Sequence, residues 1–227
     1  MRSRAGRLAA ALAAAALGAG APARAQAPVP EIPLTFSARS LLPGEGFTIS
    51  GALPGGAADG GRPLELYEQR APFPGAYAIV KLGAAGPSGE FTFGVRPTLK
   101  AYWAVVAAAT TTRPREASPG FLVAVRRKVS IRTSARRPRK GALLRFSGFV
   151  SPSFPVGPDS VATLQRRNRR GGFTDVRDVA LRAAGAFSSY RLRVRVNRSG
   201  VYRVAVPSST LYSSGASVAV TVRVRRR

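Results

Sequence analysis

The sequence predicts an all-β protein with two tandem β-sandwich domains behind a secretory leader. Three observations predict this fold. Short runs of alternating apolar and polar residues are separated by Gly, Pro, Ser and Asp turn signals. The chain also matches itself after a shift of 97 residues, and no stretch after the leader has a helical apolar period. We expect a leader over 1–25, a first domain over 26–126 and a second, strongly basic domain over 127–227.

The first 25 residues have the three parts of a signal peptide. Three arginines within the first seven residues form a positive start, an Ala/Leu-rich apolar run follows, and Ala23-Arg24-Ala25 is an A-x-A cleavage site. The apolar run is shorter than the ~20 residues that span a membrane as a helix. We therefore expect cleavage before Gln26, no transmembrane segment in the mature chain, and secretion to the extracellular space or the cell envelope.

The internal repeat covers the whole predicted mature chain. The shift of 97 residues places Phe47 on Leu144 and Ile49 on Phe146, and it places Ser50-Gly51 on Ser147-Gly148. When the alignment is allowed to shift by one residue at loops, the later strands also match, in the same order along the chain. The repeated Ser-Gly predicts the end of the second strand in each copy, where Gly would let the backbone turn.

Each copy contains seven short segments with strand character, the number of strands in a small β-sandwich. In the first copy the predicted strands are 34–38, 46–50, 64–68, 77–82, 90–95, 102–107 and 121–125. In the second copy they are 129–133, 143–149, 161–166, 173–181, 186–196, 201–206 and 217–224. The predicted core positions are Phe47, Ile49, Leu64, Leu66, Phe91, Phe93, Val123 and Val125, then Leu144, Phe146, Leu164, Phe187, Val204, Val220 and Val222.

The repeated pattern G…F-x-x-SG…L-x-x-R…G-x-F…Y-x-V…V-x-V resembles the bacterial immunoglobulin-like repeats of secreted and surface proteins, particularly those of high-GC Gram-positive bacteria. Tyr102 and Tyr202 are similar to the "tyrosine corner" of that fold. Ala104 and Val204 stand where antibody domains have a disulfide Cys. The resemblance implies a fold and a compartment but no chemistry. Because only a few residues separate the copies, at 126–129, we expect a semi-rigid end-to-end rod.

The residue types of the mature chain exclude the usual catalytic centres. It contains no His and no Cys, which excludes the usual Ser-His triads, thiolate nucleophiles and imidazole metal ligands. Phosphate-binding and calcium-binding loops are absent, and the ten carboxylates of the chain are scattered. Asp175 and Asp178 share a predicted strand, but their spacing places them on opposite faces. We expect a non-catalytic protein that needs no cofactor and no metal.

Positive charge is concentrated in the second copy. Residues 26–126 contain nine basic and seven acidic residues, whereas residues 127–227 contain twenty-three basic and three acidic ones. Alternation in the predicted strand 186–196 turns its arginines to one face. The candidate polyanion-binding residues are Arg166, Arg167, Arg169 and Arg170 on a hairpin and Arg191, Arg193 and Arg195 on a strand we expect beside it. The alternative is a solvated basic face without a ligand.

Trp103 is the single tryptophan of the chain. If Tyr102 faces the core as the tyrosine corner, Trp103 faces outward together with Tyr67 and Leu122. This apolar patch, present in the first copy only, would be a surface for a protein partner or a glycan. The alternative is that the loop 110–120 folds over it.

Two classes of function are compatible with these observations. The first is a non-catalytic extracytoplasmic binding module whose basic second domain attaches to an anionic envelope polymer such as teichoic acid, acidic glycan or lipid head groups. The second is a structural spacer or protein-docking module, partnered by another surface protein, in which the charge is incidental. Nucleic-acid binding is a weaker third, because the second copy lacks an obvious row of exposed aromatics for base stacking.

Overall fold

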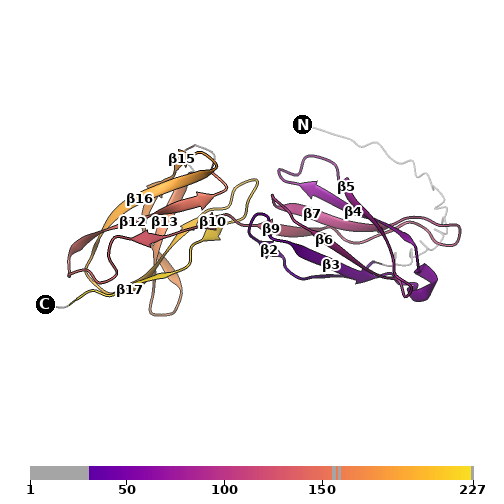
Figure 1. Ribbon diagram of the computed structural model, residues 1–227, viewed down its shortest axis with the longest axis horizontal. Helices are drawn as coiled ribbons and strands as arrows, with labels where there is room; N and C mark the ends of the chain where they lie inside the picture. The colour runs from indigo at the N-terminus through magenta and orange to yellow at the C-terminus, as the bar shows by residue number, and fades with distance from the viewer. Residues whose placement is uncertain (1–30, 155–156, 158–159, 226–227) are drawn as a thin grey trace, which may run out of the picture.

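The computed structural model describes residues 31–154, 157 and 160–225. The predicted leader, residues 1–25, lies outside the described residues. The all-β class is confirmed: the described residues form strands β1 to β19 and one short 3-10 helix, η1 (Gly56–Asp59). No helix in the described part of the chain is long and apolar enough to cross a membrane. The strands form two groups that lie end to end along the long axis (Figure 1).

Residues 31–126, here called the first half, form two sheets. The smaller sheet has the order β1-β3-β6, with β1 (Leu34–Phe36), β3 (Phe47–Ala52) and β6 (Glu90–Val95). The larger has the order β2-β9-β7-β4-β5, and β8 (Glu116–Ala117) also pairs with β7. Its strands are β2 (Ser40–Leu41), β9 (Phe121–Val125), β7 (Ala101–Ala107), β4 (Pro63–Arg70) and β5 (Ala78–Ala84).

Residues 127–225, the second half, also form two sheets. One has the order β10-β12-β16-β15, and β11 (Arg132–Thr133) pairs with β12. Its path strands are β10 (Lys128–Val129), β12 (Ala142–Ser151), β16 (Phe187–Val196) and β15 (Arg182–Ala184). The other has the order β14-β13-β17-β18, with β19 paired to β17. Its strands are β14 (Phe173–Ala180), β13 (Val161–Arg167), β17 (Gly200–Val206), β18 (Gly215–Ala216) and β19 (Val220–Val222).

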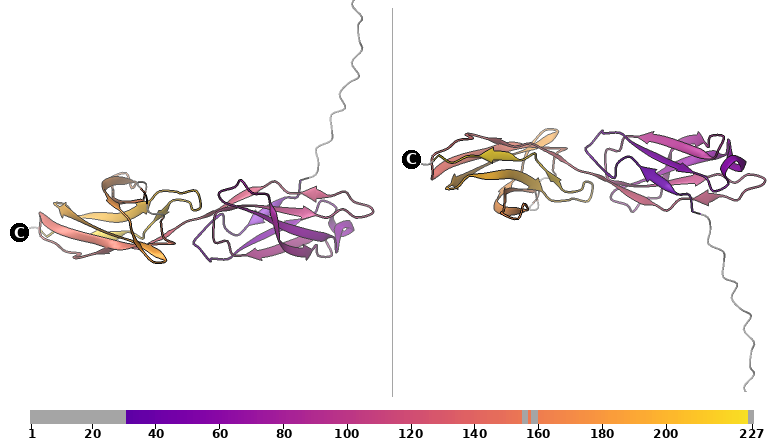
Figure 2. Two further views of the ribbon diagram at one scale, coloured as in Figure 1. Left: turned by 90° about the horizontal axis from the view of Figure 1, so that it is seen from above. Right: turned by 90° about the horizontal axis from the view of Figure 1, so that it is seen from below.

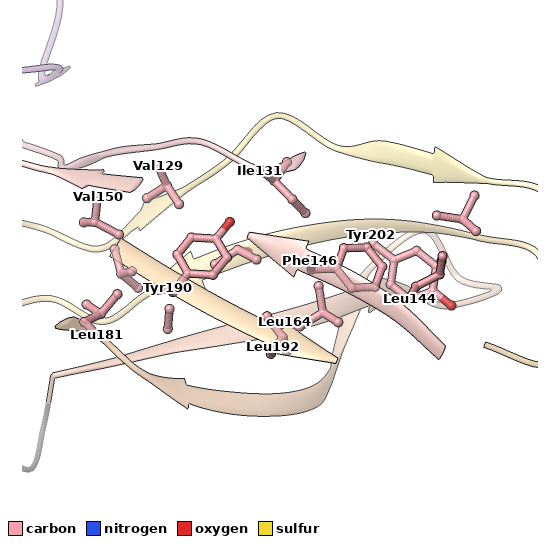
Figure 3. Close-up of a cluster of buried hydrophobic side chains, with 14 of the residues drawn as sticks. Val129, Ile131, Leu144, Phe146, Val150, Leu164, Leu181, Tyr190, Leu192 and Tyr202 are labelled. Carbon is pink, nitrogen blue, oxygen red and sulfur yellow. The ribbon is translucent and has the colours of Figure 1, made fainter. Parts of the chain in front are cut away.

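Each half has its own buried apolar cluster, to which both of its sheets contribute. In the second half, Phe146 and Leu192 from one sheet meet Leu164 and Tyr202 from the other (Figure 3). All eight core positions predicted for the first half are buried. Five of the seven predicted for the second half are also buried, and Val220 is partly buried against the cluster.

Phe187 is the one predicted core residue that lies outside the core. Its side chain is 38% exposed, and its ring lies 4.9 Å from that of Phe149 in an edge-to-face pair. Phe187 is out of phase with Val194 and Val196, so its burial would require a bulge near residues 188 and 189. No such bulge is present, because β16 pairs with β12 without a register shift from Ser188 to Val196.

The repeated Ser-Gly lies inside a strand, not at a turn as predicted. Gly51 and Gly148 occupy β3 and β12, and neither has a positive φ. A Cβ on Gly51 would lie 2.6 Å from the carbonyl oxygen of Pro33, and one on Gly148 only 2.1 Å from that of Ser130. In both halves, glycine therefore lets the preceding chain segment approach the strand closely.

Polar side-chain contacts repeat between the halves as well. The backbone N–H of Thr48 donates to Ser37 Oγ, and 97 residues later that of Arg145 donates to Ser134 Oγ. The backbone N–H of Val105 donates to Ser118 Oγ, as that of Val204 does to Ser217 Oγ. The repeated sequence therefore forms the same local structure in both halves. This structure includes serine hydrogen bonds that the pattern of apolar residues does not predict.

Arg127, the first residue of the second half, is only 1% exposed. Its guanidinium carbon lies 4.0 Å from the ring centre of Phe154 and 4.4 Å from that of Tyr212, and its Nη1 donates to Ser209 Oγ. Burial lowers the pKa of this guanidinium. The two aromatic rings stabilise the buried positive charge through cation–π contacts. Among the described residues, no carboxylate forms an ion pair with Arg127.

Backbone contacts join the halves beside Arg127. Lys100 in the first half donates from its backbone N–H to the Leu211 carbonyl and from Nζ to the Ser209 carbonyl. The N–H of Ser213 donates to the Val125 carbonyl in the same region. The views in Figure 2 show the loop of the second half that reaches toward the first. These contacts favour the predicted end-to-end arrangement.

We predict that replacing Gly148 with Ala destabilises the protein by about 2 kcal/mol or more, because the new methyl overlaps the Ser130 carbonyl and the Tyr190 hydroxyl. The matched control is Gly94→Ala in β6, where an added Cβ meets nothing within 4 Å. That change should alter the free energy of unfolding by less than about 1 kcal/mol. Urea denaturation followed by circular dichroism measures both values. Equal effects of the two substitutions would contradict the close-approach explanation.

Candidate functional site

The three strand arginines of the predicted polyanion site lie on one exposed face. In β16, the side chains of Arg191, Arg193 and Arg195 are exposed, while the residues between them point inward. Tyr190, Leu192 and Val196 are buried in the core of the second half. The alternation of a strand therefore explains why the charges share one face.

Neighbouring strands add further arginines to this face. Arg145 of β12 pairs with Arg193, and Arg132 of β11 pairs with Ser147, which in turn pairs with Arg191. Arg182 of β15 pairs with Ser189. The outer face of the sheet β10-β12-β16-β15, here called the basic face, is defined by six exposed arginines: Arg132, Arg145, Arg182, Arg191, Arg193 and Arg195.

The basic face has no carboxylate to neutralise it. None of the strands β10, β11, β12, β15 and β16, all within the described residues, contains Asp or Glu. The described carboxylates of the second half belong to β14 in the other sheet, where Asp175 accepts from Gln165 and Asp178 from Thr163. The basic face therefore carries positive charge alone, whereas the other sheet carries both signs of charge.

The four hairpin arginines lie in that other sheet, at the turn between β13 and β14. We expect β16 beside this hairpin, and the structure bears this out only in part: β16 pairs with β12 and β15, whereas β13 pairs with β14 and β17. The two sheets meet where Arg177 of β14 donates to the Arg193 carbonyl of β16. Arg166 donates to the Ser199 carbonyl, and the Arg167 guanidinium lies 5.4 Å from the Phe173 ring centre. Arg169 and Arg170 are exposed at the turn. The predicted arginines therefore form two separate groups.

The first half provides an internal comparison for the basic face. Its corresponding sheet pairs Thr48 with Gly94 and Ser50 with Thr92, where the second half pairs Arg145 with Arg193 and Ser147 with Arg191. The hydroxyls of Ser50 and Thr92 lie 3.1 Å apart and bond to each other. At these paired positions the first half is therefore uncharged, whereas the second half is strongly basic.

The predicted apolar patch around Trp103 is not a surface. Trp103 is 3% exposed and packs edge-to-face against Phe47, with 5.9 Å between ring centres. Tyr102 is the residue whose side chain turns away from that cluster, with its ring 5.1 Å from that of Phe73. The tyrosine corner predicted that Tyr102 points inward and Trp103 outward, and this prediction is wrong because the structure has the reverse. Tyr67 and Leu122 therefore lie on the opposite face of the sheet from Trp103.

Sequence reasoning missed an exposed apolar edge strand in the first half. All seven residues of β5 are exposed, including Ile79, Val80 and Leu82, and Tyr77 precedes them. β5 lies at the edge of its sheet, and Lys81 is its single charged residue. The sequence pattern predicts that one face of this strand is buried. The structure shows instead that all of its residues are exposed.

Two of the scattered carboxylates meet around one buried arginine. Arg62 Nη1 lies 3.1 Å from Asp59 and 3.3 Å from Glu116, and all three side chains are almost fully buried. Arg62 also donates to the carbonyl oxygens of Ala108 and Pro114. These bonds fasten the loop after β7 to the end of the sheet, so the cluster has a structural explanation. The described residues contain no group of three or more side chains that could hold a metal ion.

No protein-family model matches the chain, and no curated protein sequence is significantly similar to it.

The burial of Trp103 predicts its fluorescence. Acrylamide should quench the native protein weakly and the urea-unfolded protein strongly, because the indole ring packs inside the first half. Since Trp103 is the single tryptophan, the emission reports on that position alone. Equal quenching of the native and unfolded forms would contradict the position of Trp103 in the core.

Proposed function

We propose that this protein is a non-catalytic extracytoplasmic binding module that attaches to an anionic polymer of the cell envelope through the basic face. The predicted leader supports secretion, and the paired sheets with a shared core in each half support two immunoglobulin-like sandwiches. The proposal needs no cofactor and no metal.

The single observation behind the proposal is the row of arginines along β16 and its neighbours, on a face without carboxylates. Residues two apart on a strand are spaced by about 7 Å, and neighbouring strands lie about 4.8 Å apart. A flat array of positive charge at this spacing concentrates a flexible polyanion, which can lie along several guanidinium groups at once. The corresponding strands of the first half, β1, β3 and β6, contain no arginine, which argues against a compositional origin of the charge.

The location of binding can be tested with the full chain. We predict that Arg191→Gln, Arg193→Gln and Arg195→Gln together lower retention on an anionic-polymer column more than Arg167→Gln, Arg169→Gln and Arg170→Gln do. Both triple variants lose the same charge, but only the first removes the row on the basic face. The measurement is the salt concentration that elutes each protein, because salt screens such contacts.

Both triple variants should melt close to the wild type, since exposed charges add little stability. A hairpin variant that elutes at the same or lower salt than the β16 variant would place binding elsewhere. Wild-type protein that is not retained at low salt would contradict the proposed function itself.

The edge strand β5 favours a second candidate function, docking of another protein chain. An unpaired edge offers backbone N–H and C=O groups to an added strand. The other half protects its corresponding edge strand, β14, with Asp175, Arg177 and Asp178, whereas β5 has only Lys81. A second copy of this chain is the simplest partner, because a twofold axis uses the same strand twice.

Sedimentation velocity at increasing concentration tests this second candidate. We predict a dimer that is lost in Leu82→Lys, which places a charge on the exposed edge without disturbing the core. Leu143→Lys, at an exposed apolar position in the second half, is the control and should still dimerise. A wild-type protein that is monomeric at all concentrations would contradict pairing through β5.

A further inference from the structure

A hollow of about 680 Å³ lies at one end of the basic face. The side chains of the basic face that line it are Arg132, Ser147, Phe149, Arg182, Ser189 and Arg191, and Val179 and Ala180 of β14 in the other sheet also line it. The volume falls in the range of pockets that hold small molecules. Extended binding of a polymer does not require such a hollow, so its presence calls for a separate explanation.

The pairing of the strands explains how the hollow forms. One row across the sheet is Arg132, Ser147 and Arg191, contributed by β11, β12 and β16. The next row is Phe149, Ser189 and Arg182, contributed by β12, β16 and β15. In each row a serine is the central residue and a long side chain stands on either side of it. The short serines leave the space that the longer side chains enclose.

The three guanidinium groups around the hollow are available to a ligand. Within the described residues, the side chains of Arg132, Arg182 and Arg191 make no hydrogen bond, ion pair or ring contact with the rest of the protein. By contrast, Arg195 of the same face donates to the Gly141 carbonyl. Guanidinium groups form paired, charge-assisted hydrogen bonds with carboxylate and phosphate oxygens.

The other lining residues add an aromatic ring and hydroxyl groups to the hollow. Phe149 is 48% exposed and offers an apolar ring surface supported from the side by Phe187. The hydroxyls of Ser147 and Ser189 can each donate and accept a hydrogen bond. A sugar ring with a carboxylate matches the guanidinium groups, the Phe149 ring and the serine hydroxyls, since it has a negative charge, an apolar C–H surface and hydroxyl groups. A polyol phosphate chain has no ring to cover Phe149.

We propose that this hollow is a subsite for one uronic acid residue of an acidic glycan. The carboxylate bonds to the guanidinium groups, the sugar ring packs against Phe149, and the sugar hydroxyls bond to the serines. The inference rests on the proposed function, because the rest of the glycan lies along the basic face. It goes beyond that function by assigning selectivity, which a flat array of charge does not provide.

Isothermal titration of the full chain with a mannuronate tetrasaccharide tests the subsite, with inorganic polyphosphate as the second ligand. Arg182→Gln removes a wall of the hollow, and Arg193→Gln removes the same charge from the same face outside it. We expect Arg182→Gln to weaken binding of the tetrasaccharide about tenfold or more, since losing a charge-assisted bond has an effect of that order. Arg193→Gln should weaken it less than about threefold.

For polyphosphate, the two variants should lose affinity equally, because that ligand responds to the charge of the face and not to the hollow. Phe149→Thr should weaken only the tetrasaccharide, and thermal melting of each variant checks its fold. If Arg182→Gln and Arg193→Gln weaken the tetrasaccharide equally, the subsite is refuted and the proposed function stands. If wild-type protein binds neither ligand, the proposed function fails as well.

Discussion

The antiparallel ladder between β12 and β16 is the constraint on which the second half depends. Tyr190, Leu192 and Val196 must face the core, and alternation then fixes Arg191, Arg193 and Arg195 on the outside. A slip by one residue would bury three guanidinium groups, which is far more costly than losing any single contact. Because Gly148 has no side chain, β12 can lie close to Ser130, between β10 and β11. The Tyr190 hydroxyl donates a hydrogen bond to the carbonyl of the same Ser130. The same register therefore holds the core together and assembles the basic face.

The distribution of charge follows from this arrangement. The described carboxylates of the second half lie on β14, in the sheet opposite the basic face, where they bond to Thr163 and Gln165. Self-repulsion among the arginines is tolerable because solvent and salt screen exposed charges. A polyanion that replaces the screening ions gains from several guanidinium groups at once. The buried Arg127 behaves differently, since two aromatic rings and one hydroxyl of the second half enclose it.

Sequence patterns predicted the strands well and the faces less well. Period-two alternation gave strands such as Glu90–Val95 and Phe121–Val125 with the observed bounds. Trp103 was placed on the wrong face because the direction of its neighbour Tyr102 was assumed, and Phe187 was placed in the core because the repeat matched it to Phe91. The partners of β16 could not be predicted, since sheet order comes from packing between distant segments and not from local pattern. For the same reason the hollow between Arg132, Arg182 and Arg191 could not be predicted from the sequence.

The central claim is that a polyanion binds on the β12 and β16 side of the second half. Amide-resolved NMR of the full chain, titrated with an oligomannuronate, tests this most directly. The account predicts that shift changes concentrate on β11, β12, β15 and β16, with their maximum around Ser147 and Ser189. Changes centred on the turn between β13 and β14, or spread equally over both halves, would contradict it.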